Sequence, residues 1–553
     1  MIFLVILFIF YCLIAGCNSE DPFVTIPQGH VQGYYKKSFN GRTYSAFEGI
    51  PYAKPPVGHL RFAEPEAADN WNGVLIANKT YRCACYIPIV GLRGVMGDEN
   101  CLYVYVYVPL RRIVGDENLN VIIHIHGGAF MVGSPGLVAG PDYLLDEDVV
   151  YVSFNYRLAI LGFLSTEDNV VSGNNGLKDQ VMALKWVKDN IKYFGGNPDS
   201  ITLTGFSAGG ASVHYHYLSP LSKGLFHRGL SQSGTALVPW AIIEKPLTKA
   251  KQVASHLDCP THSTKEMVEC LRKTTAKDLL TAMSKLFLYF KIVPLIIFGP
   301  VIEKGDNPFL NEHPYTLIKR GEFQNVPWIT SNVKDEGIFV ALGMILTRAT
   351  NEVDKKWDEI IPYLLDLYDT VDEADKMAVT KSIRKYYYDH KPLAEDNLSS
   401  MVELINDRFF FTDTEQAIRL QSAVNKSEVY YYFFTYIPTN PSIPYFGIKK
   451  GVCHGDDVAL LFKTSFIPLR RSSRDEKMIK IFTQFIATYA NTSKPSFNNI
   501  EWLPVTPGSK LIDTMKIESP TKMEMIKMEA IGSSKFWEDL PIKENRKLFP
   551  VLR

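Results

Sequence analysis

A serine framed by glycines is the residue of this sequence best placed to do chemistry. Ser207 stands in Gly205-Phe206-Ser207-Ala208-Gly209, between a short alternating stretch and a longer helical run. A strand that turns this sharply into a helix strains its serine, and the glycines remove side chains that would collide there. We therefore expect the Ser207 hydroxyl to project above the end of a strand. Small residues also fill ordinary turns, so the pentapeptide alone does not decide the function.

A second glycine pair could supply part of an anion-binding site. Gly127 and Gly128 follow residues 121–125, a stretch that is apolar on both faces, as a central strand covered by helices should be. Adjacent glycines let a ligand approach backbone N–H groups closely. If Ser207 is a nucleophile, we expect Gly127 and Gly128 to form an oxyanion hole with Ala208, whose N–H lies at the positive end of a helix dipole.

The intervening segments predict a parallel α/β sheet that brings these motifs together. Residues 149–156 have the pattern of another buried strand. Apolar residues then recur at helical spacing over 177–191, and this helix ends at a Gly-Gly-Asn-Pro stop. A strand, a helix, the strand before Ser207 and another helix make an α/β unit. Active sites in such folds lie at the carboxyl ends of the strands, where both motifs are expected.

The 553-residue chain shows no internal repeat and no linker rich in proline, glycine or serine. We therefore expect a single large domain over residues 18–553 rather than several. Lysine plus arginine and aspartate plus glutamate number 59 each, so the net charge is zero. This balance gives no indication of a nucleic-acid partner or of binding to an anionic membrane surface.

The first 17 residues form an apolar run followed by polar residues. The run is short for a membrane-spanning helix and fits a secretory signal, with Ala15 and Gly16 suited to cleavage. An alternative is lipoprotein processing at Cys17. The C-terminal residues carry neither a hydrophobic tail for a lipid anchor nor a retention signal. We therefore expect a soluble, secreted protein without a stable membrane anchor.

Secretion makes the remaining cysteines candidates for disulfides. Six of them follow the N-terminal run: Cys83, Cys85, Cys101, Cys259, Cys270 and Cys453. Cys259 and Cys270 predict a local bridge. Cys85, or Cys83 in its place, is expected to pair with Cys101 and close a loop of about 15 residues, which would stabilise the fold by ~3 kcal/mol. Four glycosylation sequons agree with export: Asn78, Asn397, Asn425 and Asn491.

Nine motifs together resemble the type-B carboxylesterase and cholinesterase family of α/β-hydrolases, insect esterases in particular. They occur in the family's order over nearly the whole chain: FEGIPYAKPPVGHLRF (47–62), DENCLYVYVY (98–107), HGGAF (126–130), NYRLAILGFLST (155–166), NNGLKDQ (174–180), GFSAGG (205–210), SQSG (231–234), DEG (335–337) and CHGDD (453–457). The resemblance implies a large, mostly parallel central sheet with helices on both faces and helical insertions around an active-site gorge.

The same resemblance implies Ser207 as nucleophile, Glu336 as acid and His454 as base, in the chain order that α/β-hydrolases share. Imidazole titrates near neutrality and can take the serine proton as the hydroxyl attacks a carbonyl. Glu336 would hold the imidazole in the correct tautomer and stabilise the imidazolium. The chemistry yields an acyl-enzyme and an alcohol, followed by hydrolysis, and needs no metal or cofactor.

The resemblance also assigns residues around the reacting groups. It implies that Trp240 lines the acyl pocket and that Phe130 lines the gorge beside the oxyanion hole. It places Ser233 as a hydrogen-bonding neighbour of the acid. Arg61 and Glu99 are expected to form a structural ion pair.

Two departures from the family bear on the substrate. Residues 85–101 lack the tryptophan that stacks on choline in cholinesterases, which argues against a choline ester. Phe206 stands where glutamate is common and where juvenile hormone esterases tend to have glutamine. This weakens, without excluding, the case for that hormone.

The leading hypothesis is a secreted carboxylesterase whose small-molecule partner is an apolar or moderately apolar ester, of dietary, xenobiotic, odorant or hormonal origin. One alternative is a binding protein on the same fold. Another is slow turnover that sequesters toxic esters stoichiometrically. The sequence gives no oligomeric state.

Overall fold

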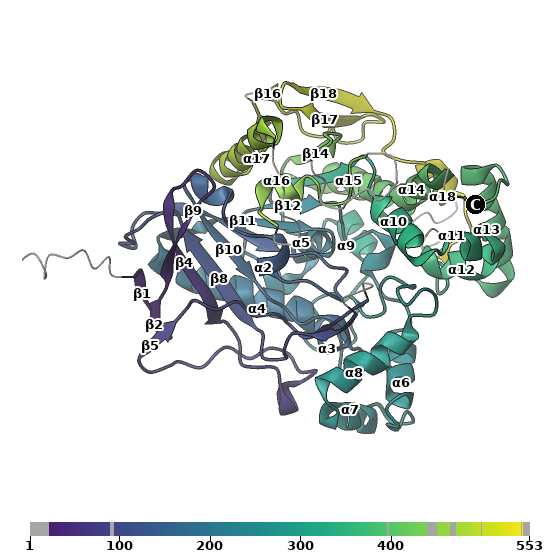
Figure 1. The fold of residues 1–553 in the computed structure, drawn as a ribbon, viewed down its shortest axis with the longest axis horizontal. Helices are drawn as coiled ribbons and strands as arrows, with labels where there is room; N and C mark the ends of the chain where they lie inside the picture. Colours follow the sequence, from purple (N-terminus) through teal and green to yellow (C-terminus); the bar gives the residue numbers. More distant parts are fainter. Residues whose placement is uncertain are drawn as a thin grey trace, which may run out of the picture.

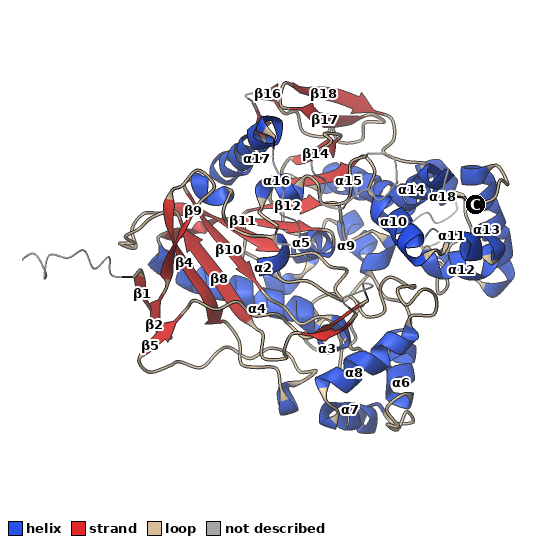
Figure 2. Cartoon of the chain, viewed as in Figure 1, coloured by secondary structure: helices blue, strands red, loops and turns tan. Residues whose placement is uncertain are grey.

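An eleven-stranded mixed sheet forms the centre of the molecule (Figures 1 and 2). Its strands lie in the order β18 (Lys522–Met528), β17 (Ile512–Ser519), β14 (Val429–Phe434), β13 (Trp328–Val333), β12 (Arg228–Gln232), β11 (Gly196–Phe206), β9 (Leu119–Ile125), β10 (Val149–Phe154), β8 (Tyr103–Val108), β4 (Thr43–Pro51) and β3 (Tyr34–Lys37). Neighbours from β10 to β17 pair in parallel, whereas the pairs at both edges are antiparallel. The predicted mostly parallel α/β sheet is confirmed.

Helices cover both faces of this sheet. Strand β9 contributes side chains to both of the resulting cores, because successive side chains of a strand point to opposite faces of the sheet. Its Val121, Ile123 and Ile125 enter one core together with side chains of α4 (Asn175–Asn190) and α5 (Ala208–Leu218). Ile122 enters a second core with residues of α17 (Ser473–Thr492). Strands buried on both sides therefore need the continuous apolar runs that the sequence provides.

Two groups of helices extend beyond the layered core. One comprises α6 (Pro246–Ser255), α7 (Thr264–Lys273) and α8 (Ala276–Met283), which lie together in the lower part of Figure 1. The other, at the right of that view, includes α10 (Ile338–Thr347), α12 (Trp357–Leu364), α13 (Glu373–Tyr388) and α14 (Leu398–Asn406). Helix α15 (Thr412–Val424) packs close to β13 and β14. These groups are the predicted helical insertions.

The computed structural model describes residues 21–88, 93–394, 397–439, 451–464, 472–498, 500–543 and 545. The apolar run 1–17, assigned above to a secretory signal, lies outside them. Within the described ranges, no helix combines the length and apolarity needed to span a bilayer. Among the sequons, Asn78 and Asn491 are exposed, whereas Asn397 and Asn425 are half-buried.

Two disulfides are present among the described residues, and one differs from the expected pairing. Cys259 bonds to Cys270 as predicted, but Cys83, not Cys85, bonds to Cys101. Strand pairing explains the choice. Cys83 pairs with Asp98, just before Cys101, and the two cysteine Cα atoms lie 5.0 Å apart. Cys85 begins β6 (Cys85–Ile87), opposite Met96, and remains a buried free thiol, so the Cys85–Cys101 prediction is wrong.

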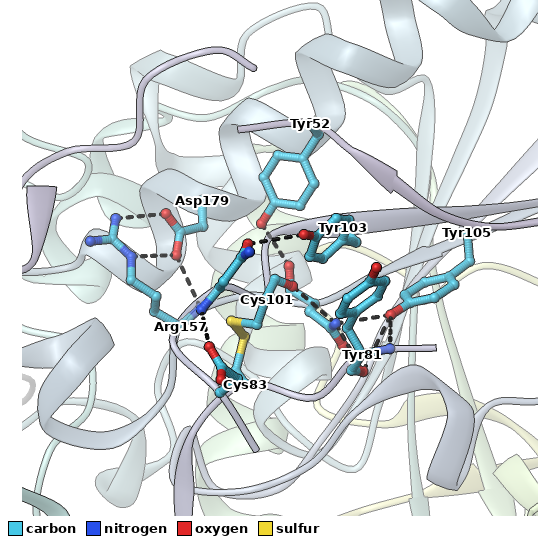
Figure 3. The surroundings of a disulfide bond; sticks show 11 residues. Tyr52, Tyr81, Cys83, Cys101, Tyr103, Tyr105, Arg157 and Asp179 are labelled. Carbon is cyan, nitrogen blue, oxygen red and sulfur yellow. Dashed lines mark hydrogen bonds and ion pairs between the residues drawn. A yellow bond between two sulfur atoms is a disulfide. The ribbon is translucent and has the colours of Figure 1, made fainter. Parts of the chain in front are cut away.

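The Cys83–Cys101 bridge lies among buried polar contacts (Figure 3). Nδ2 of Asn155 donates to the carbonyl oxygen of Cys101 (3.0 Å). On the other side, Arg157 and Asp179 form a fully buried ion pair at 2.7 Å. The predicted Arg61–Glu99 pair is also confirmed, with two hydrogen bonds of 2.6 Å between guanidinium and carboxylate.

Candidate active site

Ser207 occupies a strained turn at the end of β11. Its φ and ψ are 57° and −122°, a conformation that costs free energy for any residue other than glycine. The turn requires glycine on both sides, because a Cβ at Gly205 would overlap the carbonyl oxygen of Gly209, and one at Gly209 would overlap that of Ile125. The Ser207 N–H donates to the carbonyl oxygen of Gln232 in β12 (2.8 Å). Ser207 remains partly accessible to solvent, whereas Ala208 is buried.

Glu336 lies in the turn that follows β13, and it is fully buried. Its Oε1 accepts hydrogen bonds from the N–H of Val333 (3.0 Å) and from Nδ2 of Asn332 (3.4 Å). Its Oε2 lies 2.6 Å from Nδ1 of His454. A buried carboxylate with this set of partners is held in one orientation, with one oxygen directed at the imidazole.

His454 lies in the loop between β14 and α16 (Val458–Leu461). Within residues 451–461 it is the one residue that is not buried, and its side chain is 13% exposed. Because Nδ1 faces Glu336, Nε2 is the nitrogen directed elsewhere. The carboxylate thus fixes the tautomer in which Nδ1 carries the proton and Nε2 can accept one.

Backbone pairing joins the acid loop to the histidine loop. The Asp335 N–H donates to the carbonyl oxygen of Val452 (3.0 Å), and the Val452 N–H donates to Oδ2 of Asp335 (2.9 Å). The histidine loop also meets the nucleophile turn, since the rings of Phe206 and His454 lie 4.5 Å apart between centroids. Segments that are remote in sequence therefore converge at the carboxyl ends of β11, β13 and β14.

The glycine loop after β9 lies beside Ser207. A Cβ at Gly127 would lie 3.1 Å from Cβ of Ser207. The carbonyl oxygen of Gly127 accepts from Nδ1 of His126 (2.8 Å), and that of Gly128 accepts from the N–H of Val132 (2.9 Å). Within the described residues, the N–H groups of Gly127, Gly128 and Ala208 donate to no acceptor. Such donors can receive a developing oxyanion.

Aromatic rings surround the imidazole. The rings of Phe206, Phe410 and Phe339 have centroids 4.5, 4.8 and 5.4 Å from that of His454. Trp240, predicted in the acyl pocket, is buried 6.2 Å from Phe410, and its Nε1 donates to the carbonyl oxygen of Phe409 (2.9 Å). The reacting groups therefore have an apolar wall, which suits apolar portions of a ligand.

Phe130 is fully buried and follows the glycine loop directly. Its ring lies 5.3 Å from that of Phe163, and its carbonyl oxygen accepts from the N–H of Ala159 (2.8 Å). Phe130 thus packs behind the glycine loop and supports its conformation. Its contact with a ligand stays a prediction.

The family comparison decides the class of this arrangement. The sequence model of the Carboxylesterase family matches residues 20–534. The chain belongs to the carboxylesterase family. A carboxylic ester hydrolase of Bombus ignitus is 40% identical to this carboxylesterase over 96% of each chain. Venom carboxylesterase-6 of Apis mellifera is 38% identical over 98% of each.

A solved structure agrees with the family match. The crystal structure of juvenile hormone esterase from Manduca sexta, with OTFP covalently attached, superposes with a TM-score of 0.84 at 26% identity, covering 94% of this chain and 99% of that one. This carboxylesterase therefore has the α/β-hydrolase fold and is a carboxylic ester hydrolase, as the nine motifs predicted.

The predicted hydrogen bond between Ser233 and Glu336 is absent from the described part of the chain, and Asn406 holds the turn around Glu336 instead. Ser233 is buried, but its Oγ has no hydrogen-bond partner within the described residues. The acid turn is held instead by Asn406, whose Oδ1 accepts from the Gly337 N–H (2.8 Å) and whose Nδ2 donates to the carbonyl oxygen of Lys334 (3.1 Å). Asn406 ends a helix, so no local sequence signal identified it.

Asp457 provides a buried carboxyl group close to the candidate site, and its contacts were not predicted from the sequence. Oδ2 of Asp457 accepts from the hydroxyl of Tyr432 (2.6 Å) and from Nε2 of Gln232 (3.0 Å). Burial raises the pKa of Asp457, although both hydrogen bonds oppose that shift. Gln232 also holds the Ser207 N–H, so this group connects the histidine loop to the nucleophile turn. The Gly-Asp-Asp signature after His454 was the available signal.

The other histidines of the core have structural partners, as expected. His124 contacts Thr204 (2.9 Å), His214 contacts Gln421 (2.6 Å) and His216 contacts Ser222 (2.7 Å). Burial lowers the pKa of His214 to about 4 and those of His124 and His216 to about 3. They are therefore neutral near pH 7, and such low pKa values do not suit a general base that works near neutrality.

Proposed function

We propose that this carboxylesterase hydrolyses apolar esters through an acyl-enzyme formed on Ser207. The Ser207 Oγ attacks the ester carbonyl carbon while Nε2 of His454 takes the hydroxyl proton. The tetrahedral intermediate collapses, the C–O bond to the alcohol breaks, and His454 returns the proton to the leaving alcohol. Water then attacks the acyl-enzyme with His454 again as base, which releases the acid and restores Ser207.

The observation that carries this proposal is the 2.6 Å contact between Glu336 and His454, in a loop whose histidine packs against the residue preceding Ser207. The N–H groups of Gly127, Gly128 and Ala208 are the proposed donors to the oxyanion, each contributing roughly 10²-fold or more in rate. Phe206, Phe339 and Phe410 favour apolar acyl or alcohol groups.

A burst experiment with p-nitrophenyl acetate tests the reaction. An acyl-enzyme that turns over gives a rapid release of nitrophenol, stoichiometric with protein, followed by sustained hydrolysis. A burst without steady turnover would indicate a protein that sequesters esters, and no burst would indicate a binding protein. Ser207→Ala should abolish both phases and labelling by an organophosphate. Labelling that persists in this variant would place the nucleophile elsewhere.

The substrate and the location are further parts of the proposal. The juvenile hormone esterase of Tribolium castaneum is 35% identical over 89% of this chain, and Phe206 is the residue that argues against the same substrate here. Hydrolysis rates for esters of graded acyl and alcohol size, with juvenile hormone as one member, separate the alternatives. Two disulfides and the apolar run 1–17 support secretion, which N-terminal sequencing of exported protein would test.

A further inference from the structure

A groove with a volume of about 670 Å³ lies outside the candidate active site. Helix α6, the segment 285–297 and the turn that follows α12 form its walls, and α6 lies in the lower helical group of Figure 1. Ser207, Glu336 and His454 are absent from its lining. Its volume falls in the range of sites that hold small molecules, roughly 300 to 1,000 Å³.

One wall of the groove is apolar. Leu286, Leu288, Pro294 and Ile297 supply it from one irregular segment. Leu288 is 56% exposed, an unusual position for leucine beside other apolar groups. Burying such an apolar surface against a ligand would be favourable.

The facing wall, on α6, is polar and basic. Thr248, Lys249 and Gln252 of α6 line the groove together with Lys245, the residue that caps the N-terminus of the helix. Thr248 and Lys249 stand four and three positions before Gln252, a spacing that places them beside it on one face of the helix. A polar helix face opposite an apolar segment leaves a space in which a ligand would meet cationic groups on one side and hydrocarbon on the other.

The charge balance of the lining is positive. The lining holds four lysines and one carboxylate, that of Asp369, whose oxygens lie 2.9 Å from Nζ of Lys245 and 3.6 Å from Nζ of Lys249. Outside the lining, Asp366 and Glu244 also act on Lys249. Lys251 and Lys285 also line the groove, and neither forms an ion pair with any residue in the described part of the chain.

Lys249 is the most buried of these cations, with 9% of its side chain exposed. Its Nζ lies 5.2 Å from the centroid of the Tyr368 ring. Burial lowers the pKa of Lys249, although Asp366, Asp369 and Glu244 oppose that shift. Nζ of Lys249 also donates to the carbonyl oxygen of Glu244 (3.1 Å), so this cation is held in place at the groove wall.

We propose that this groove is a second ligand site, which binds a single-chain amphiphilic carboxylate with its chain along Leu286, Leu288 and Ile297 and its head group at the lysines. The site is independent of the reaction at Ser207. Its ligand is a long-chain carboxylate in monomeric form, recognised by charge and chain length rather than by an ester group.

Calorimetric titration of dodecanoate into the Ser207→Ala protein tests this site, because no ester chemistry can then contribute. We expect saturable binding below 1 mM, on the order of fourfold tighter per added methylene from octanoate to dodecanoate. Dodecyltrimethylammonium, which has the same chain and the opposite charge, should bind at least fivefold more weakly, since one exposed charge contact accounts for up to roughly fivefold in affinity.

Matched variants distinguish the groove from other apolar surfaces. Leu288→Asp and Lys285→Glu should each weaken dodecanoate binding by roughly fivefold or more, the order expected for one lost contact. Leu346→Asp changes a leucine with nearly equal exposure (55%), and Lys277→Glu changes an exposed lysine of nearby α8; both should leave binding unchanged.

Two outcomes would overturn the proposal. One is dodecanoate binding that both groove variants leave intact. The other is association with anionic vesicles that depends on Lys285 while monomeric dodecanoate does not bind, which would make the groove a membrane-contact surface. Ester hydrolysis is measured separately, so failure here leaves the reaction at Ser207 untouched.

Discussion

Nδ1 of His454 lies 2.6 Å from Oε2 of Glu336, although 118 positions separate the two residues in the chain. The carboxylate is fully buried, and the Val333 N–H fixes its other oxygen. The two side chains therefore already have the relative orientation that the proposed proton transfer requires.

Glu336→Gln should lower kcat by about 10³- to 10⁴-fold, because an amide can occupy the same space but cannot stabilise the imidazolium or fix its tautomer. KM should change little. The measurement is steady-state hydrolysis of p-nitrophenyl esters, with an unchanged thermal unfolding midpoint as the control for folding. A kcat within tenfold of the parent would show that Glu336 is not the acid.

Phe206→Glu should move the acidic limb of the kcat/KM profile to higher pH. Phe206 contacts His454, so a carboxylate there would favour the protonated imidazolium, which cannot act as base. Phe206→Gln removes the same ring without adding charge and serves as the control. If both variants shift the limb equally, lost packing rather than charge is responsible.

Gly128→Ala should reduce kcat by about 10²- to 10³-fold, the range for losing one oxyanion donor. Gly128 has φ of 120°, and a Cβ there would overlap the carbonyl oxygen of Val132, so the loop must shift. Gly343→Ala is the matched control, because the space around Gly343 is open and it lies inside α10. That control should keep full activity and gain up to about 1 kcal/mol in stability.

Cys83→Ser should destabilise the fold by about 3 kcal/mol, since it removes a bridge that closes a loop with a sequence separation of 18. Cys85→Ser should cost less, because Cys85 contributes only a buried thiol. Unfolding midpoints of the two variants give the comparison, and peptide mapping without reduction identifies the partner of Cys101. Recovery of a Cys85–Cys101 peptide from the parent protein would contradict the pairing.

The sequence by itself determined the local features. Glycine at 205 and 209 predicted the turn at Ser207, and a Cβ at Gly205 would indeed overlap the nearby backbone of Gly209, which is a local steric rule. Continuous apolar runs at β9 and β10 predicted buried parallel strands for the same reason. The motif order added Glu336 and His454 as the predicted acid and base.

Tertiary structure alone decided which distant groups meet. Cys83 and Cys85 are equivalent by composition, and only the strand pairing at Asp98 selected Cys83. Phe339, Phe410 and Asn406 carry no motif, because their contacts with the site depend on how α10, α14 and the π-helical turn Asp407–Phe411 pack in the fold. Such contacts join segments far apart in the chain, so they follow from the closed fold and not from local sequence pattern.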